Sequence, residues 1–273
     1  MYKDILVFAD RAKSWESRQA ATIDLANRFD SHVTGLYVVE PVVLPAYAEV
    51  AIGAELLQES RESSLNEAKR IGEGFRSKLD HAGVANEWRV VEGACAARTI
   101  DNAHYSDIVV MSQQNSEDID DYHTGLIDDV VLGCGRPVLV LPYIGVPENF
   151  GSTILLAWNG SRESVRALHD TMPLLQKAQK VIVMTVNPET DSDHIAGADI
   201  SVHLARHDVR TVVNSTVSGD IDIGDTLLSR AADEGVDLIV MGGYGHSRFR
   251  ELVLGGATRH LLHHMTVPVV MSH

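Results

Sequence analysis

Short apolar runs rich in Ile, Val and Leu recur along the chain, and segments with helical spacing of apolar residues lie between them. Runs of this kind are typical of strands buried on both faces of a parallel sheet. In the first half, strands are predicted at 4–10, 32–39, 87–91, 107–111 and 137–141, and helices at 14–29, 54–81 and 94–104. Because strands that alternate with helices require crossover connections, the sheet is expected to be parallel and covered on both faces.

The same order of elements repeats in the second half, where strands are predicted at 153–159, 181–186, 209–217, 237–241 and 267–271. The segment between the halves contains the breakers Pro142, Gly145, Pro147 and Gly151. A repeat of this length indicates a tandem architecture. We therefore predict an α/β protein of two open, doubly wound, Rossmann-like parallel sheets with about five strands each. The expected domains are 1–142 and 152–273, joined by a linker at 143–151.

Glycines end one buried strand of the second half and begin the helix that follows. Gly242 and Gly245 come directly after the apolar run at 238–241, whereas Gly255 and Gly256 precede a segment with helical spacing. The start of a helix offers free N–H groups and a partial positive charge, and residues without a Cβ let an anion approach that backbone. The pattern predicts a phosphate site.

The segment between these glycine clusters is basic, since Arg248, Arg250 and the following Arg259 stand against one acid, Glu251. A P-loop is excluded because G-x-x-x-x-G-K-[ST] does not occur, and a dinucleotide motif is disfavoured because Arg248 stands at the third glycine of G-x-G-x-x-G. Glycines that only form tight turns are the alternative. Two clusters around a basic segment favour a ligand.

The spacing Gly242-x2-Gly245-x9-Gly255-Gly256 is similar to the nucleotide loop of the universal stress proteins, G-x2-G-x9-G-[ST]. The resemblance extends over nearly the whole chain, and it implies an adenine nucleotide alpha hydrolase-like fold with strand order 3-2-1-4-5 in each half. The chain departs from the pattern at Gly256, where ATP-binding members usually carry Ser or Thr. A hydroxyl that could bond phosphate is therefore missing.

The resemblance implies a site for ATP or another adenine nucleotide, with Mg as a candidate companion ion. The residues that it implies for the base and ribose are Ala157, Trp158, Asn159 and Val186. Those that it implies for the phosphates are Gly242, Gly245, Gly255, Gly256, Ala257 and Thr258, and Met241 is expected as a further cofactor-binding residue. The family usually carries Asp where this chain has Asn159, and Trp158 suits a core position as well as stacking on a base. Ser161 also suits a helix N-cap.

The first half lacks the glycine loop, because Ser112 and Gln113 follow its fourth strand. The segment leading into its helix instead carries six carboxylates, Glu117, Asp118, Asp120, Asp121, Asp128 and Asp129. Each close contact between like charges costs on the order of 1 kcal/mol even near the surface. We therefore expect nucleotide binding in the second half alone.

Composition narrows the class of protein. The chain has 273 residues, and its 38 acids against 23 bases give a net charge of −15, which disfavours a nucleic-acid partner. No apolar run approaches a membrane span, so no membrane partner is expected. The two cysteines, Cys95 and Cys134, form neither a CxxC nor a disulfide framework. A reducing, cytoplasmic location is expected.

Two histidine pairs have helical spacing, His203 with His207 and His260 with His264, but neither has the further ligands that zinc needs. No metal site and no catalytic residue is predicted, since no G-x-S-x-G elbow or Cys–His pair is indicated. The expected function is a regulatory stress-response protein that binds an adenine nucleotide. The alternatives are a slow ATPase and a nucleotide-free interaction module.

The fifth strands, 138–141 and 267–271, are apolar and stand at the edge of each predicted sheet. An exposed apolar edge invites pairing with another strand. By resemblance to single-domain members, which pair such edges across a twofold axis, we expect the halves to form an intramolecular pseudo-dimer. A homodimer of chains is a further expectation.

Overall fold

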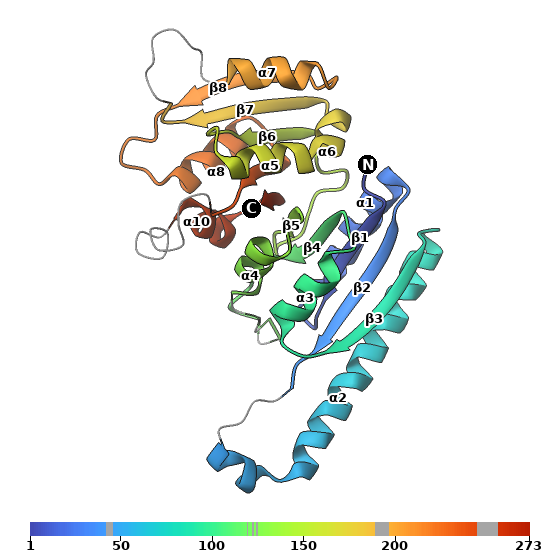
Figure 1. The fold of residues 1–273 in the computed structure, drawn as a ribbon. Helices are drawn as coiled ribbons and strands as arrows, with labels where there is room; N and C mark the ends of the chain where they lie inside the picture. The colour runs from blue at the N-terminus through green and yellow to red at the C-terminus, as the bar shows by residue number, and fades with distance from the viewer. Residues whose placement is uncertain (42–45, 119, 122, 124, 189–196, 245–255) are drawn as a thin grey trace.

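The structure is a computed structural model, and it describes residues 1–41, 46–118, 120, 121, 123, 125–188, 197–244 and 256–273. Its strands are β1 (Asp4–Ala9), β2 (His32–Val39), β3 (Asn86–Glu92), β4 (Ile108–Ser112), β5 (Val138–Leu141), β6 (Thr153–Ala157), β7 (Lys180–Val186), β8 (Thr211–Thr216), β9 (Leu238–Gly242) and β10 (Val269–Ser272). Its helices are α1 (Trp15–Phe29), α2 (Ala46–His81), α3 (Cys95–Ala103), α4 (Leu126–Gly133), α5 (Arg162–Asp170), α6 (Met172–Lys177), α7 (Ala198–Ala205), α8 (Ile223–Asp233) and α10 (Ala257–His264). The long helix α2 begins before the predicted residue 54, and its first turns extend past the end of β2 (Figure 1).

Each half forms the predicted parallel sheet, and the strand order is the one that the resemblance implies. The described strands make one ten-stranded sheet in the order β3-β2-β1-β4-β5-β10-β9-β6-β7-β8. Within each half all neighbouring strands are parallel. The two predicted sheets are therefore not separate, because an antiparallel pair joins β5 to β10.

The pair of β5 and β10 is symmetric with respect to the internal repeat. Val138 and Val269 hold equivalent places, since they pair with Val109 of β4 and Ile239 of β9 respectively. Across the join, Val269 lies opposite Val140. Leu139 lies opposite its own counterpart, Val270. Each half thus presents the same strand to the other, as in an isologous twofold contact.

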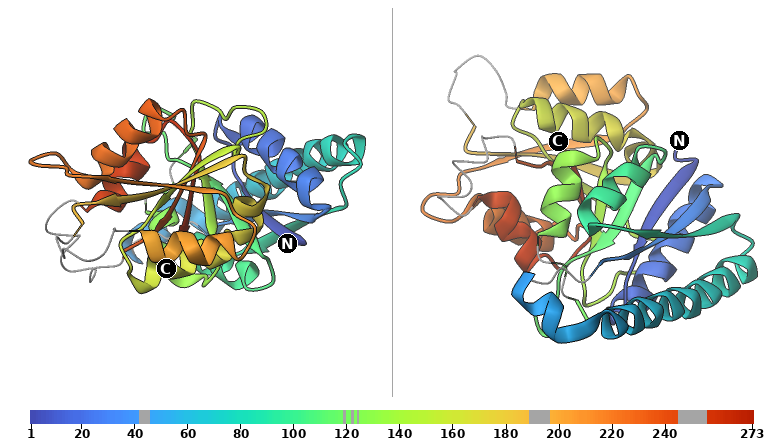
Figure 2. Two further views of the ribbon diagram at one scale, coloured as in Figure 1. Left: turned by 90° about the horizontal axis from the view of Figure 1, so that it is seen from above. Right: turned by 60° about the horizontal axis from the view of Figure 1, so that its bottom comes forward.

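Helices cover both faces of the sheet, and each face has its own apolar cluster (Figure 2). Alternate residues of β1 separate accordingly, with Ile5 and Val7 in one cluster and Leu6 and Phe8 in the other. The first cluster takes side chains from α1, α2, α5, α6 and α7, and the second from α3, α4, α8 and α10. Among the described residues, no helix is both long and apolar enough to span a membrane.

Candidate functional site

A cavity of about 170 Å³ lies at the carboxyl ends of β6 and β9. These strands are neighbours in the sheet although β7 and β8 come between them in the chain, so the strand order reverses at this point. Ligand sites of open α/β sheets lie at such a reversal. The described lining is Ala157, Trp158, Asn159, Ser161, Glu163, Met184, Val186, Ile223, Leu227, Met241, Gly242, Ala257 and Thr258.

The predicted site residues thus come together wherever they are described, with one exception. Ala157, Trp158, Asn159, Val186, Met241, Gly242, Ala257 and Thr258 all line the cavity. Gly256 lies next to it as the N-cap of α10. Gly245 and Gly255 fall outside the described residues, as do the basic residues Arg248 and Arg250.

Part of the cavity lining is apolar. Met184 and Val186 contribute from β7, and Ile223 and Leu227 from α8. The half-buried Trp158 also packs against the core, and its backbone N–H donates to the carbonyl of Met184 at 2.8 Å. An apolar wall with an indole beside it suits a planar base.

The turn from β6 into α5 carries the first polar groups. Asn159 is exposed, and its Oδ1 accepts from the backbone N–H of Ser161 at 3.1 Å. Ser161 is the N-cap of α5, as its sequence context predicts, and its Oγ accepts from the N–H of Ser164 at 3.2 Å. This turn holds Asn159 at the rim of the cavity.

Gly242, at the end of β9, is needed for a close approach between two elements. A Cβ at Gly242 would lie 2.6 Å from the carbonyl carbon of Glu163 and 2.6 Å from the nitrogen of Ser164. The structure therefore shows a close approach of Gly242 to the first turn of α5. Glycine lets the strand pass directly beneath this helix.

The N-terminus of α10 lies at the cavity. Gly256 caps it in extended conformation (φ −52°, ψ 151°) and has no side chain to bond the first-turn N–H groups. Thr258 is buried, and its Oγ1 lies 3.5 Å from the backbone nitrogen of Tyr244. A helix start without a side-chain cap leaves N–H donors for a ligand.

Glu163 is a lining residue that the sequence analysis did not identify. Its side chain is 8% exposed, and Nη2 of Arg162 donates to its Oε1 at 3.1 Å. Burial would raise the pKa of this carboxyl, but hydrogen bonds from its own backbone N–H, Arg162 and Ser161 outweigh burial and hold the pKa below its usual value. The carboxylate of Glu163 therefore places a negative charge on the α5 side of the cavity.

The corresponding place in the first half is filled by a buried ion pair. The strand registers make Asp10 equivalent to Asn159, and Ser112 equivalent to Gly242. Arg18 of α1 is 1% exposed and donates to both carboxylate oxygens of Asp10, at 3.0 and 3.2 Å. Its Nε donates to the hydroxyl of Ser112 at 2.8 Å. A guanidinium thus occupies the reversal point of the first half.

The acidic residues of the first half bind protein groups. Asp118 accepts from the backbone N–H of Lys13 at 2.8 Å, and Asp121 from that of Asn115 at 2.6 Å. Asp128 forms an ion pair with Arg259 of the other half at 3.4 Å. These contacts were not predicted, since each joins segments far apart in the sequence or depends on the loop geometry.

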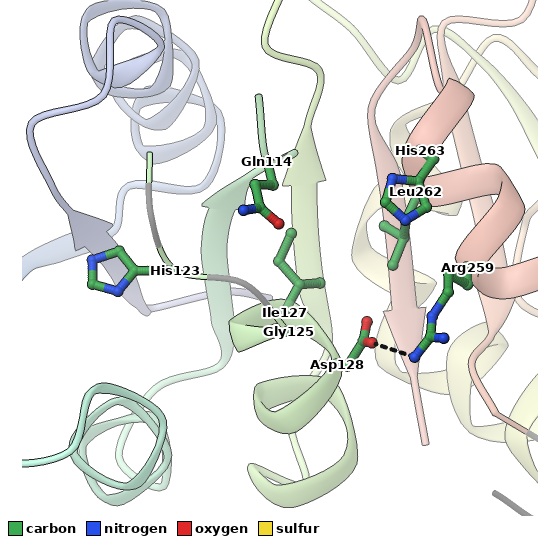
Figure 3. Close-up of a pocket in the computed structure, with 8 residues that line it drawn as sticks. All are labelled: Gln114, His123, Gly125, Ile127, Asp128, Arg259, Leu262 and His263. Atoms are coloured by element: carbon green, nitrogen blue, oxygen red, sulfur yellow. Dashed lines mark hydrogen bonds and ion pairs between the residues drawn. The ribbon is translucent and has the colours of Figure 1, made fainter. Parts of the chain in front are cut away.

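A second cavity, of about 330 Å³, lies between α4 of the first half and α10 of the second (Figure 3). Its described lining is Gln114, His123, Gly125, Ile127, Asp128, Arg259, Leu262 and His263. The ion pair of Asp128 and Arg259 bridges the two helices at its edge.

The histidine pair of α10 is hydrogen-bonded to protein groups, whereas the pair at the end of α7 shows contact between its rings. His260 Nε2 lies 2.7 Å from Oδ1 of Asp225, and His264 Nδ1 lies 2.9 Å from the carbonyl of His260. The rings of His203 and His207 are 4.8 Å apart. Within the described part of the chain, no group of three or more His, Cys, Asp or Glu residues could hold a metal ion.

Comparison with known proteins gives a family and a fold. The sequence pattern of the universal stress protein family matches residues 152–273. A universal stress protein from Archaeoglobus fulgidus DSM 4304 matches with a TM-score of 0.77 at 15% identity, over 98% of this chain and 95% of that chain. A functionally unknown protein from Pseudomonas aeruginosa PAO1 matches with a TM-score of 0.63 at 12% identity, over 99% and 92%. A search of curated proteins gives no match.

The family pattern covers the second half of the chain, and the fold matches cover the whole of it. At these identities the solved structures show the fold, and they show it for the whole chain. Residues 152–273 match as a domain of the universal stress protein family. The full-length fold match fits a tandem arrangement of such domains.

Proposed function

We propose that this chain binds an adenine nucleotide, ATP or AMP, in the cavity between β6 and β9, and acts as a regulatory stress-response protein. One observation carries the proposal. The cavity combines an apolar wall beside Trp158 with the uncapped N-terminus of α10. A base needs the first environment and a phosphate group the second, and one site here offers both.

The size and charge of the cavity indicate how a nucleotide would lie. A volume of about 170 Å³ is below the roughly 300–1,000 Å³ of drug-sized ligand sites, so the cavity encloses a base while the phosphates extend outward. Glu163 keeps its negative charge, and the phosphates therefore lie toward Gly256 and Ala257. A Mg ion bound to the phosphates would offset this charge.

The nucleotide is expected in the second half alone. In the first half, the ion pair of Arg18 and Asp10 occupies the equivalent position, and Ser112 replaces the glycine. The halves are proposed to act as one unit, an intramolecular pseudo-dimer joined by β5 and β10. The buried free thiols of Cys95 and Cys134 support a reducing compartment, and we propose the cytoplasm.

Two substitutions of Gly256 test the site in opposite directions. Gly256→Ser restores a hydroxyl at the start of α10 and should tighten ATP binding about tenfold, which corresponds to ~1.4 kcal/mol. Gly256→Asp places a carboxylate beside the phosphates and should weaken binding at least about tenfold. Both residues are good N-caps, so neither variant should lower the melting temperature.

Calorimetric titration measures the affinity of the wild type and both variants for ATP. Thermal unfolding of each protein checks that its stability is unchanged. Mass spectrometry of small molecules released from the purified protein identifies a nucleotide that it already carries. Equal affinity in all three proteins would place the ligand elsewhere, and no heat of binding in any of them would leave the chain as an interaction module.

A further inference from the structure

The cavity between the halves can be compared with its own counterpart, because the chain is an internal repeat. Helices α4 and α10 have equal length and begin after glycines at equivalent places, Gly125 and Gly256. Asp128 is therefore the counterpart of Arg259. The register of β4 and β9 likewise makes Gln114 the counterpart of Tyr244. At equivalent places on the two sides of the β5–β10 pair, Asp128 thus stands against Arg259 in charge, and Gln114 against Tyr244 in size.

On one side of the join, the space is filled by the protein itself. Tyr244 of the second half is 9% exposed, and its hydroxyl donates to Oδ1 of Asp128 in the first half at 2.5 Å. The backbone leading to it, at Gly243, lies close to Val131 of α4. A phenol ring with a donor directed at a carboxylate occupies this position.

On the other side of the β5–β10 pair, the cavity of about 330 Å³ lies at the place equivalent to the ring of Tyr244. Gln114 is the counterpart of Tyr244 there, and Arg259 is the counterpart of Asp128 (Figure 3). Ile127 and Leu262 supply apolar walls from the two helices. The cavity therefore has space for an aromatic ring that the chain does not provide. The ring of Tyr244 points to an acceptor, the carboxylate of Asp128, whereas a ring in the cavity would point to a donor, the guanidinium of Arg259.

We propose that this cavity binds a small aromatic carboxylate. The ring replaces the phenol that Gln114 lacks, and the carboxylate accepts from the guanidinium of Arg259. That guanidinium is half-exposed, and its contact with Asp128 is long, at 3.4 Å, so it can turn toward a second anion. Asp128 lies beside it, which favours a monoanion over a phosphate group with two charges. A volume near the lower end of the range for ligand sites suits a single ring.

Benzoate is the probe, and saturation-transfer NMR with a concentration series gives its dissociation constant for the full chain. We expect saturable binding of benzoate and at least about tenfold weaker binding of benzamide, which has the same shape without the charge. Gln114→Tyr should fill the cavity and weaken benzoate at least about tenfold. Arg259→Gln should do the same without adding volume. Acetate, which lacks the ring, should also bind at least about tenfold more weakly.

Arg230→Gln is the matched control, because Arg230 is also a half-exposed helical arginine that faces an acid, Asp233, at 3.7 Å. It should leave benzoate binding unchanged. Circular dichroism checks the fold of each variant, and if Gln114→Tyr does not fold, Arg259→Gln decides alone. Absence of saturable benzoate binding, equal binding of benzamide, or affinity within twofold of wild type in Arg259→Gln would overturn the proposal.

Discussion

At the scale of residues, the two halves differ by what lies at the reversal point of each sheet. The first half has Asp10 and Ser112 there, and Arg18 bonds to both. The second half has Asn159 and Gly242 at the equivalent places, and a cavity lies between them. The buried guanidinium of Arg18 thus fills, in the first half, the position that is a cavity in the second half.

This ion pair should be essential to the stability of the first half. Arg18→Met leaves the buried carboxylate of Asp10 without its cation and should lower the free energy of unfolding by about 3–5 kcal/mol. Adding Asp10→Asn removes the unpaired buried charge, and the amide oxygen of Asn can still accept from the N–H of Ala12. Most of the lost free energy of unfolding should therefore be recovered in the double variant. Urea denaturation of the single and double variants measures both values, and a double variant no more stable than Arg18→Met would contradict the account.

The sequence predicted that the first half lacks a site from the missing glycine loop and from the acids at 117–129. The structure shows Asp118 and Asp121 bonded to backbone N–H groups, and it adds a second feature, the guanidinium of Arg18 at the reversal point. The pair of Arg18 and Asp10 was not predicted, because it depends on how α1 lies across the end of β1. A contact of this kind has no sequence periodicity from which it could be predicted.

At the scale of elements, the site depends on how closely β9 passes beneath α5. No Cβ fits at Gly242, and its two nearest neighbours are backbone atoms, which cannot move aside as a side chain can. This approach brings Glu163 and Ser161 to the cavity beside Met241. The packing of strand on helix thereby positions polar groups of the site.

Gly242→Ala should therefore separate β9 from α5. We expect a loss of about 1–3 kcal/mol in the free energy of unfolding, as for overpacked cores, and weaker ATP binding with it. Gly74→Ala in α2 is the matched control, because nothing lies within 4 Å of its added Cβ. It should stabilise the helix by about 0.5–1 kcal/mol. Denaturation of both variants checks this, and equal effects would refute the role given to close packing.

Most elements of the fold could be predicted from the sequence, because apolar runs and helical spacing are local signals. The predicted run at 237–241 became β9, and the predicted helix at 94–104 became α3. The site was predictable only in part. Glu163, Met184 and Leu227 line the cavity because α5, β7 and α8 converge there, and that convergence is set by tertiary packing.

At the scale of the whole molecule, one antiparallel contact makes a continuous sheet of both halves. Val140 and Val269 lie directly opposite each other in it, and both are fully buried. The contact covers the apolar edge that each half would otherwise expose. It also brings α4 and α10 together, and so creates the cavity between the halves.

Lysines at Val140 and Val269 together should disrupt this contact, since two like charges would be buried face to face. We expect a loss of about 4 kcal/mol or more in the free energy of unfolding and an expanded scattering envelope. The matched control replaces Val90 and Val212 with lysine, because both valines are exposed on the outer strands β3 and β8. If both double variants unfold at the same temperature as wild type, the halves are not held together by β5 and β10.

The central claim is that one half of this chain binds an adenine nucleotide and the other does not. Calorimetric titration of ATP into the full chain, with Mg present, tests it through the stoichiometry. The account predicts one nucleotide per chain, because Arg18 fills the equivalent position of the first half. Two nucleotides per chain, or one that binds unchanged in Gly256→Asp, would contradict it.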